Sequence, residues 1–342
     1  MTTIDRAQQR TDWIQRLPGP AVLAIEPASA DASFRSYWRL RLADGSTRIV
    51  MDAPPGQEDV RPWLDVARRL RAAGVHAPAV HGQDPDLGFL LLEDLGDRLY
   101  LPVLSEATVG RLYGEAIEAL MRMQRGGDTS GLPDYDDARL VAEMELMPEW
   151  FLRRHLAVEP ACEHWDIVEL AFRRLADNAL GQPQMFVHRD FHSRNLLITE
   201  DNTPGVIDFQ DAVRGPITYD LVSLLRDCYI AWPVQRVDAW VEQYRQRLVD
   251  AGATDADPRR FRRWFDLMGL QRHLKVLGIF CRLNYRDGKA GYLADLPRVW
   301  HYTREVMALY PEFDELRQLL VAAIAGRDLT VPAPPSDPTA AP

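Results

Sequence analysis

The stretch His188-Arg189-Asp190-Phe191-His192-Ser193-Arg194-Asn195, followed by Val206-Ile207-Asp208-Phe209-Gln210, decides the fold of this chain. Short apolar runs flank it, with Met185-Phe186-Val187 before it, Leu196-Leu197-Ile198 after Asn195, and Gly205 opening the last run. Asp201-Asn202 predicts a turn between the last two runs. The pattern therefore predicts strand, loop, strand, turn and strand, with Asp190, Asn195 and Asp208 beside the strand ends.

These residue types, in this order, suit phosphoryl transfer. The acceptor hydroxyl must be oriented and relieved of its proton, which the carboxylate of Asp190 can do. Mg²⁺ bridges the phosphates and prefers oxygen ligands, here the amide of Asn195 and the carboxylate of Asp208. A single aspartate on a tight turn is more often a cap for backbone amides. The prediction therefore depends on the three residues taken together.

The set His188-x-Asp190, Asn195, Ile207-Asp208-Phe209 and Tyr219-Asp220-Leu221 resembles the aminoglycoside phosphotransferase and choline kinase branch of the kinase-like superfamily, from about residue 20 to 310. The resemblance implies an α+β, bilobal protein-kinase-like fold with a small β-rich N-lobe and a large, mostly helical C-lobe. It also implies ATP and Mg²⁺ as cofactors and structural roles for His188 and Asp220. A plain N-terminal helix carboxylate is the alternative for Asp220.

Longer strings resemble one group within this branch, the bacterial N-acetylmuramate/N-acetylglucosamine anomeric kinases of cell-wall recycling. The resemblance implies ATP-dependent phosphorylation of the C1 hydroxyl of such an amino sugar. The strings are Ala32-Ser33-Phe34-Arg35, Ile49-Val50-Met51-Asp52-Ala53-Pro54-Pro55, Arg272-His273-Leu274-Lys275-Val276-Leu277-Gly278 and Asn284-Tyr285-Arg286-Asp287-Gly288-Lys289.

The nucleotide side departs from the pattern of the superfamily, which places a lysine on the third strand against the phosphates. Lys275 and Lys289 are the only lysines, so no lysine can take that place. The pattern puts Met51 or Arg48 near it, and Arg35 is an equally good candidate for the phosphates. An edge residue in solvent is the alternative for Arg48.

Two further segments are predicted to meet the nucleotide. Small residues around Ser33 and Phe34 replace a glycine-rich loop and still let backbone amides approach phosphates, although an ordinary polar turn would look the same. The resemblance makes Glu93 and Leu95 the hinge whose backbone meets adenine. By itself that string is a strand followed by a turn.

For the acceptor, Arg272, His273, Lys275 and Arg282 lie on one predicted helix. Arg272, Lys275 and Arg282 are spaced close to whole turns, so they could meet a carboxylate such as the lactyl group of N-acetylmuramate. A solvated basic helix face is the alternative for each residue taken alone.

The remaining pattern predicts a β-rich N-terminal lobe over residues 1–95, a catalytic and substrate lobe over 96–327, and a disordered Pro- and Ala-rich tail over 328–342. Strands are predicted at 36–42, 48–51, 79–81 and 89–92, beside helices at 3–17 and 57–73. Helices are predicted over 109–123, 137–156, 164–178, 219–230, 234–251, 258–283 and 296–310.

Composition limits the partners of the 342-residue chain. A net charge of −10 and a pI of about 5.3 disfavour nucleic acid and anionic membranes. No apolar run is long enough to span a bilayer, and acidic residues stand where a signal peptide would be apolar. Three scattered cysteines predict buried free thiols. We expect a cytoplasmic monomer whose partners are a small sugar and ATP.

Two other functions fit the same residues. The reaction could use another small alcohol, such as an aminoglycoside or a choline-like acceptor, because the overall charge allows an acidic pocket. The missing lysine and glycine loop also fit a nucleotide-binding pseudokinase, although such a binding module has no need of Asp190, Asn195 and Asp208 together.

Overall fold

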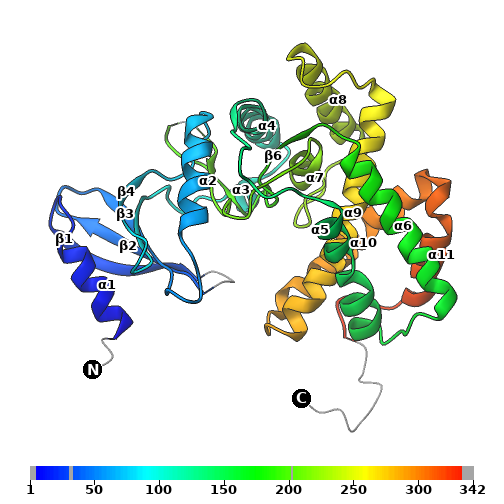
Figure 1. Ribbon diagram of the computed structural model, residues 1–342, viewed down its shortest axis with the longest axis horizontal. Helices are drawn as coiled ribbons and strands as arrows, with labels where there is room; N and C mark the ends of the chain where they lie inside the picture. Colours follow the sequence, from blue (N-terminus) through cyan, green and yellow to red (C-terminus); the bar gives the residue numbers. More distant parts are fainter. Residues whose placement is uncertain (1–4, 31–33, 202, 333–342) are drawn as a thin grey trace, which may run out of the picture. The chain divides into compact units, whose positions relative to one another are not determined.

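The structure is a computed structural model that describes residues 5–30, 34–201 and 203–332 (Figure 1). Its strands are β1 (Val22–Ala30), β2 (Ser36–Leu42), β3 (Thr47–Asp52), β4 (Val80–Asp84), β5 (Phe89–Glu93), β6 (Gln184–Val187), β7 (Leu196–Leu197), β8 (Gly205–Val206) and β9 (Val213–Pro216). Its α-helices are α1 (Arg6–Gln15), α2 (Arg61–Ala72), α3 (Tyr100–Val103), α4 (Val109–Gly126), α5 (Asp137–Met144), α6 (Cys162–Leu180), α7 (Tyr219–Leu225), α8 (Val234–Asp250), α9 (Pro258–Tyr285), α10 (Leu296–Leu309) and α11 (Asp314–Ile324). A π-helix, η1 (Met147–His155), and two 3₁₀ segments, η2 (Ala290–Asp295) and η3 (Pro311–Phe313), complete the described elements.

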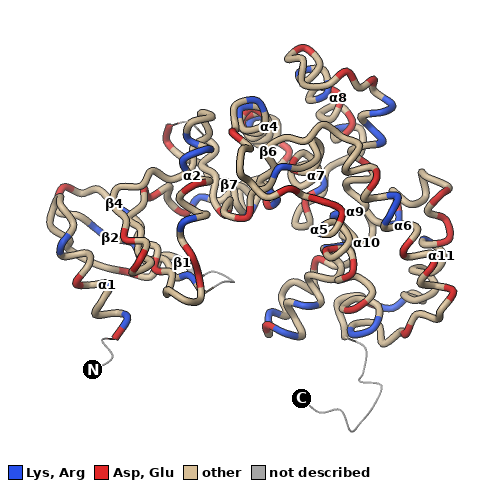
Figure 2. Tube along the Cα trace, viewed as in Figure 1, with Lys and Arg blue, Asp and Glu red and all other residues tan. Residues whose placement is uncertain are grey.

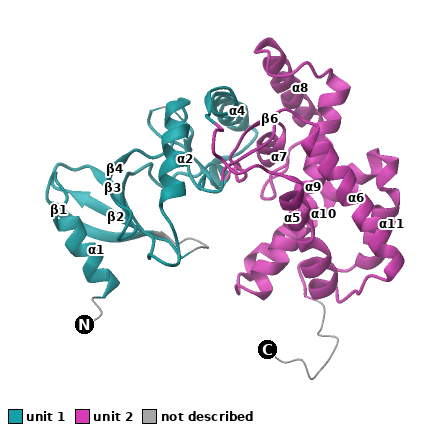
Figure 3. Cartoon of the chain, viewed as in Figure 1, with its two compact units in different colours: residues 1–128, 194–211 teal, residues 129–193, 212–342 magenta. Residues whose placement is uncertain are grey.

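The chain forms two compact units (Figure 3). Unit 1 holds residues 1–128 and 194–211, and unit 2 holds residues 129–193 and 212–342. The chain therefore leaves unit 2 directly after Ser193 and returns to it at Ala212. The predicted lobes, with boundaries at residues 95 and 327, are defined by nucleotide binding and catalysis, whereas these units are defined by contacts. The lobe boundaries therefore stay a prediction. Residues 333–342 of the predicted disordered tail lie outside the described residues.

Unit 1 contains an antiparallel sheet in the order β1-β2-β3-β5-β4. Helix α1 covers one face of it, where Trp13 and Ile14 pack with Val50 and Phe89. On the same face the buried carboxylate of Asp52 accepts hydrogen bonds from Arg6 and Arg10 at 2.8 and 2.9 Å. Alternation along β3 thus assigns residues 48, 50 and 52 to the face that α1 covers.

Strand β1 and helix α11 lie outside the predicted elements. β1 contains Pro27, which argues against a strand in a sequence pattern. A proline is tolerated here because β1 is an edge strand and its register shifts between Pro27 and Ser29. Helix α11 carries Leu316, Leu320 and Ile324 at helical spacing, a signal that was present in the sequence.

Unit 2 is built around α9, which is buried on nearly every side over its central turns and packs against α5, α6, α7, α8 and α10. Gly278 lets α9 approach the chain closely, because a Cβ there would lie 2.3 Å from the carbonyl oxygen of Leu146. The predicted single helix over 137–156 is wrong in this respect: α5 ends at Met144, and a π-helix begins at Met147 beside this contact. The predicted helix from 219 likewise ends earlier, at Leu225.

Surface charge is mixed in both units, where basic and acidic residues are interspersed along the chain (Figure 2). Several exposed arginines pair with carboxylates, as Arg41 does with Glu26 at 3.1 Å. Cys228 and Cys281 are buried free thiols as predicted, whereas Cys162 is exposed. Among the described residues, every helix is too short or too polar to cross a bilayer.

Candidate active site

The loop that carries Asp190 follows β6 in unit 2 and is held by hydrogen bonds from its own backbone. His188 N and Arg189 N donate to the two carboxylate oxygens of Asp220, at 2.7 and 3.0 Å. Arg189 has a φ of 78°, a conformation that a non-glycine residue keeps only when its surroundings fix it. Asp190 N donates to His188 Nδ1 at 3.2 Å. The Asp220 carboxylate therefore contacts the backbone of this loop, and the His188 ring contacts the backbone N–H of Asp190.

Positive charge surrounds the carboxylate of Asp190 within unit 2. Burial alone would raise its pKa, but Lys275, His192 and Arg272 together hold the pKa below its usual value. For Asp220 burial outweighs the opposing effects of the two backbone N–H donors and Arg272, and raises the pKa to about 7. Asp190 is thus an ionised carboxylate near neutral pH, which is the state that a general base requires.

Asn195 and Asp208 meet in unit 1, on a hairpin of β7 and β8 in which Leu196 pairs with Val206. Asn195 Nδ2 donates to Asp208 Oδ2 at 3.3 Å, and Ile207 N donates to the carbonyl of Asn195 at 3.1 Å. Asp208 has a φ of 63°. The hairpin therefore places an amide oxygen and a carboxylate side by side.

This donor set fits a hard cation that keeps other ligands. Among residues 5–30, 34–201 and 203–332, no group of three His, Cys, Asp or Glu could hold a metal. Mg²⁺ usually takes one or two protein oxygens and completes its shell with water and phosphate. The side chain of Asp208 is 40% exposed, so room for such ligands remains.

The predicted phosphate ligands differ in their surroundings. The side chain of Arg35 is 8% exposed, and its Nη2 lies 3.8 Å from Asp208 Oδ1. Arg48 belongs to the β3 face that α1 covers and donates to the carbonyl of Thr47 at 2.8 Å. Phe34 is 65% exposed, and Ser33 lies outside the described residues.

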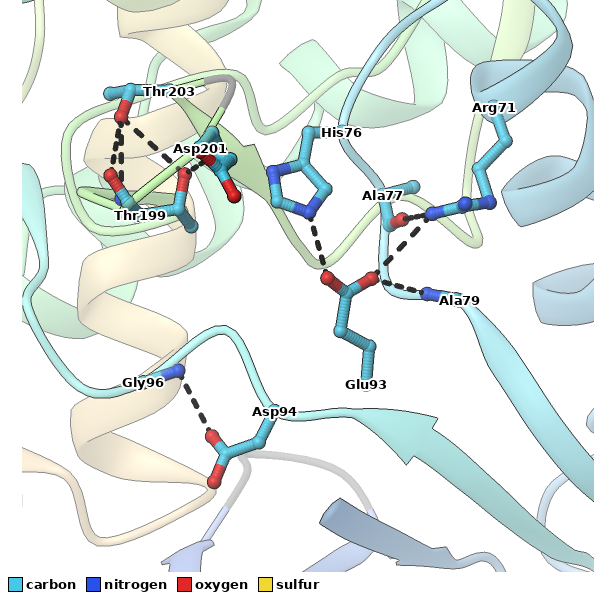
Figure 4. Close-up of polar contacts among 10 residues, drawn as sticks. All are labelled: Arg71, His76, Ala77, Ala79, Glu93, Asp94, Gly96, Thr199, Asp201 and Thr203. Carbon is cyan, nitrogen blue, oxygen red and sulfur yellow. Dashed lines mark hydrogen bonds and ion pairs between the residues drawn. The ribbon is translucent and has the colours of Figure 1, made fainter. Parts of the chain in front are cut away.

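The predicted hinge is fastened through the side chain of Glu93 (Figure 4). Its carboxylate contacts His76 Nε2 at 3.0 Å and accepts a hydrogen bond from Ala79 N at 3.0 Å, with Arg71 at 3.6 Å. Burial would raise the pKa of Glu93, but these partners lower it. Leu95 packs close to Gly205, where a Cβ would lie 2.9 Å from Leu95 Cδ1. Because these contacts hold the Glu93 side chain, it is the backbone of Glu93 that the hinge prediction assigns to adenine.

The predicted acceptor residues on α9 divide into different environments. Lys275 Nζ lies 3.0 Å from Glu143 and 3.2 Å from the Tyr219 hydroxyl. Arg272 is buried over the Tyr219 ring, and its Nε has no hydrogen-bond partner among the described residues. Arg282 is half-buried, and its Nε likewise lacks a partner in the described chain. Arg272 and Lys275 therefore both lie beside the Tyr219 ring.

Glu143 is a neighbour of the predicted acceptor residue Lys275 that the sequence pattern did not reveal. Besides Lys275, its carboxylate contacts Arg189 and the hydroxyl of Tyr135. Burial would raise the pKa of Glu143, but Lys275 and Arg189 lower it. Glu143 lies on α5 with no motif around it, so no local signal could have identified it.

His273 turns away from this cluster. It is fully buried, its Nε2 contacts the carbonyl of Arg226 at 3.1 Å, and its ring stacks on Tyr302 at 5.0 Å. Burial, together with Arg226 and Arg272, lowers the pKa of His273 to about 3. These contacts describe a core histidine.

We expect His273 to make the protein sensitive to acid. Below the pKa of an unfolded histidine, the unfolded chain takes up a proton that folded His273 excludes, so stability falls as pH falls. The loss reaches about 2 kcal/mol at pH 5. Urea unfolding at pH 7.5 and pH 5 should show a smaller loss in His273→Phe, which keeps the ring stack. Equal losses in both proteins would contradict this assignment.

Comparison with known proteins adds a family, relatives and a fold. Residues 24–264 match the model of the phosphotransferase enzyme family. N-acetylmuramate/N-acetylglucosamine kinase of Pseudomonas putida is 44% identical over 304 residues, which cover 89% of this chain and 89% of the relative. The kinase of the same name from Pseudomonas aeruginosa is 46% identical, covering 88% and 89%.

Solved structures agree on the fold. An ADP-bound aminoglycoside phosphotransferase, APH(2'')-Ib, matches with a TM-score of 0.60 at 14% identity, covering 89% of this chain and 98% of that one. A choline/ethanolamine kinase family protein from Mesorhizobium loti matches with a TM-score of 0.61 at 15% identity, covering 94% and 100%. The predicted α+β, protein-kinase-like fold is confirmed.

Proposed function

Because this chain belongs to the phosphotransferase enzyme family, we propose that it transfers the γ-phosphoryl group of ATP to the anomeric C1 hydroxyl of an amino sugar. The names of relatives that are 44% and 46% identical support N-acetylmuramate and N-acetylglucosamine as acceptors. A place in the recycling of cell-wall sugars is what the sequence resemblance implies. The observation that carries the reaction class is the carboxylate of Asp190 on a loop whose backbone is held by Asp220.

In this proposal Asp190 orients the sugar hydroxyl and accepts its proton. Asn195 and Asp208 hold magnesium, which when bound neutralises charge on the phosphates. Arg35 takes the phosphate role of the missing strand lysine, since it lies beside Asp208, whereas Arg48 is on the α1 face. Backbone groups at Glu93 and Leu95 receive adenine, and His188 and Asp220 keep the loop in shape.

We assign roles to the predicted acceptor residues from the contacts that each side chain makes. We assign Arg272 and Arg282 to the sugar or its carboxylate, because each has a guanidinium nitrogen without a partner in the described chain. Lys275 acts through Glu143, which it contacts at 3.0 Å. His273 supports the helix from its contact with Arg226. The cytoplasmic location, the monomeric state and the absence of nucleic-acid binding stay predictions.

A panel of acceptors tests this function. Purified protein is incubated with ATP, Mg²⁺ and one of N-acetylmuramate, N-acetylglucosamine, an aminoglycoside or choline, and product is followed by ³¹P NMR. We expect a sugar phosphate whose phosphorus couples to the anomeric proton. A product only from the aminoglycoside or choline would replace the acceptor, and ATP binding without any product would favour a pseudokinase.

A further inference from the structure

Asp227 holds the far end of the Asp190 loop. It lies just beyond the C-terminal end of α7, with 1% of its surface exposed. Its Oδ2 accepts hydrogen bonds from the backbone N and the Oγ of Ser193, at 3.0 and 2.5 Å. Its Oδ1 accepts one from Tyr229 N at 3.0 Å. Each oxygen of this buried carboxylate therefore has a defined partner.

The loop is thus held on both sides of Asp190 by one short segment of unit 2, made of α7 and the residues directly after it. Asp220, in the first turn of α7, binds the backbone of His188 and Arg189. Asp227, after the last turn, binds Ser193. Carboxylates therefore bind the backbone of this loop both before and after Asp190, which limits the conformations open to it.

The segment that carries Asp227 is itself rigidly supported from α9. Arg226 Nη2 donates to the buried carboxylate of Asp266 at 2.5 Å, and the carbonyl of Arg226 meets His273 Nε2 at 3.1 Å. A continuous set of buried contacts therefore runs from α9 through Arg226 and Asp227 to Ser193. Ser193 is also the last residue before the chain passes into unit 1, which begins again at Arg194.

We propose that Asp227 is a positioning residue for phosphoryl transfer, which acts by holding Ser193 so that Asp190 keeps its reactive orientation. The inference rests on the proposed function, because it assumes that Asp190 is the base. A misplacement of a catalytic group by about 1 Å can cost about 100-fold in rate, so such an anchor has a kinetic effect beyond its contribution to folding.

Two substitutions test the contact from its two ends. Asp227→Asn keeps the shape but replaces one acceptor oxygen by an NH₂ group, which must then face a donor, either those of Ser193 or the backbone N–H of Tyr229. Ser193→Ala removes only the hydroxyl. We expect kcat to fall about 100-fold in Asp227→Asn and about 10-fold in Ser193→Ala, with KM for ATP unchanged. In the double variant the loss should be smaller than the product of the single losses.

Ser223→Ala is the matched control, since Ser223 is equally buried on α7 but donates to the carbonyl of Tyr219. It should keep wild-type kcat even if it lowers Tm. Wild-type kcat in folded Ser193→Ala overturns the proposal, as does a loss that appears only in KM. Ser193→Ala decides the matter if Asp227→Asn does not fold. Absence of sugar phosphate from the wild type and Ser223→Ala would instead contradict the proposed function.

Discussion

We expect Asp190→Asn to lower kcat by about 1,000-fold while ATP still binds, because an amide cannot accept the proton of the sugar hydroxyl. The amide has nearly the same shape, and the loop anchors on Asp220 do not involve the Asp190 side chain. The residues proposed to hold the nucleotide and metal are likewise unchanged. The defect should therefore appear in kcat and not in KM for ATP.

The measurement pairs steady-state kinetics on N-acetylglucosamine with ATP affinity from titration calorimetry. Asp255→Asn is a suitable control, since it makes the same chemical change at a side chain that is 94% exposed in unit 2. Turnover of Asp190→Asn at the wild-type rate would eliminate Asp190 as the base. Loss of ATP binding in this variant would mean that the residue acts on nucleotide binding instead.

The parts of this protein that were predictable are those in which chemistry fixes both residue type and spacing. Asp190 and Asn195 are five residues apart on one loop, and Asp208 follows a two-strand hairpin, so a local pattern carries them. Hairpin β2-β3 and the long helices follow from periodicity in the same way. For these elements local and tertiary preferences agree.

The missed features depend on contacts between distant segments. Glu143 contacts Arg189 and Lys275, which are far away in the sequence. Asp227 contacts Ser193, and nothing near either residue marks the pair. The sequence also did not show that Arg35, and not Arg48, lies beside Asp208. Strand pairing and the packing of α1 place Arg48 on the face of the sheet that α1 covers. Side-chain direction of this kind is set by register, which a single sequence leaves open.

Asp208→Ala should be as damaging as the loss of the base, with a different kinetic signature. The change removes the one carboxylate proposed to hold magnesium and leaves Asn195 alone, which costs several kcal/mol of transition-state stabilisation, or about 1,000-fold in kcat. It also releases Arg35 from its ion pair at 3.8 Å and Gln210 from its hydrogen bond at 3.0 Å. Because affinity for the ion falls, the magnesium concentration for half-maximal rate should rise, so high Mg²⁺ restores part of the activity.

Asp190→Asn should show no such rescue. Asp211→Asn, a neighbouring exposed carboxylate that also contacts Gln210, should behave like wild type. If Asp208→Ala keeps the magnesium dependence of the wild type, Asp208 does not hold the ion.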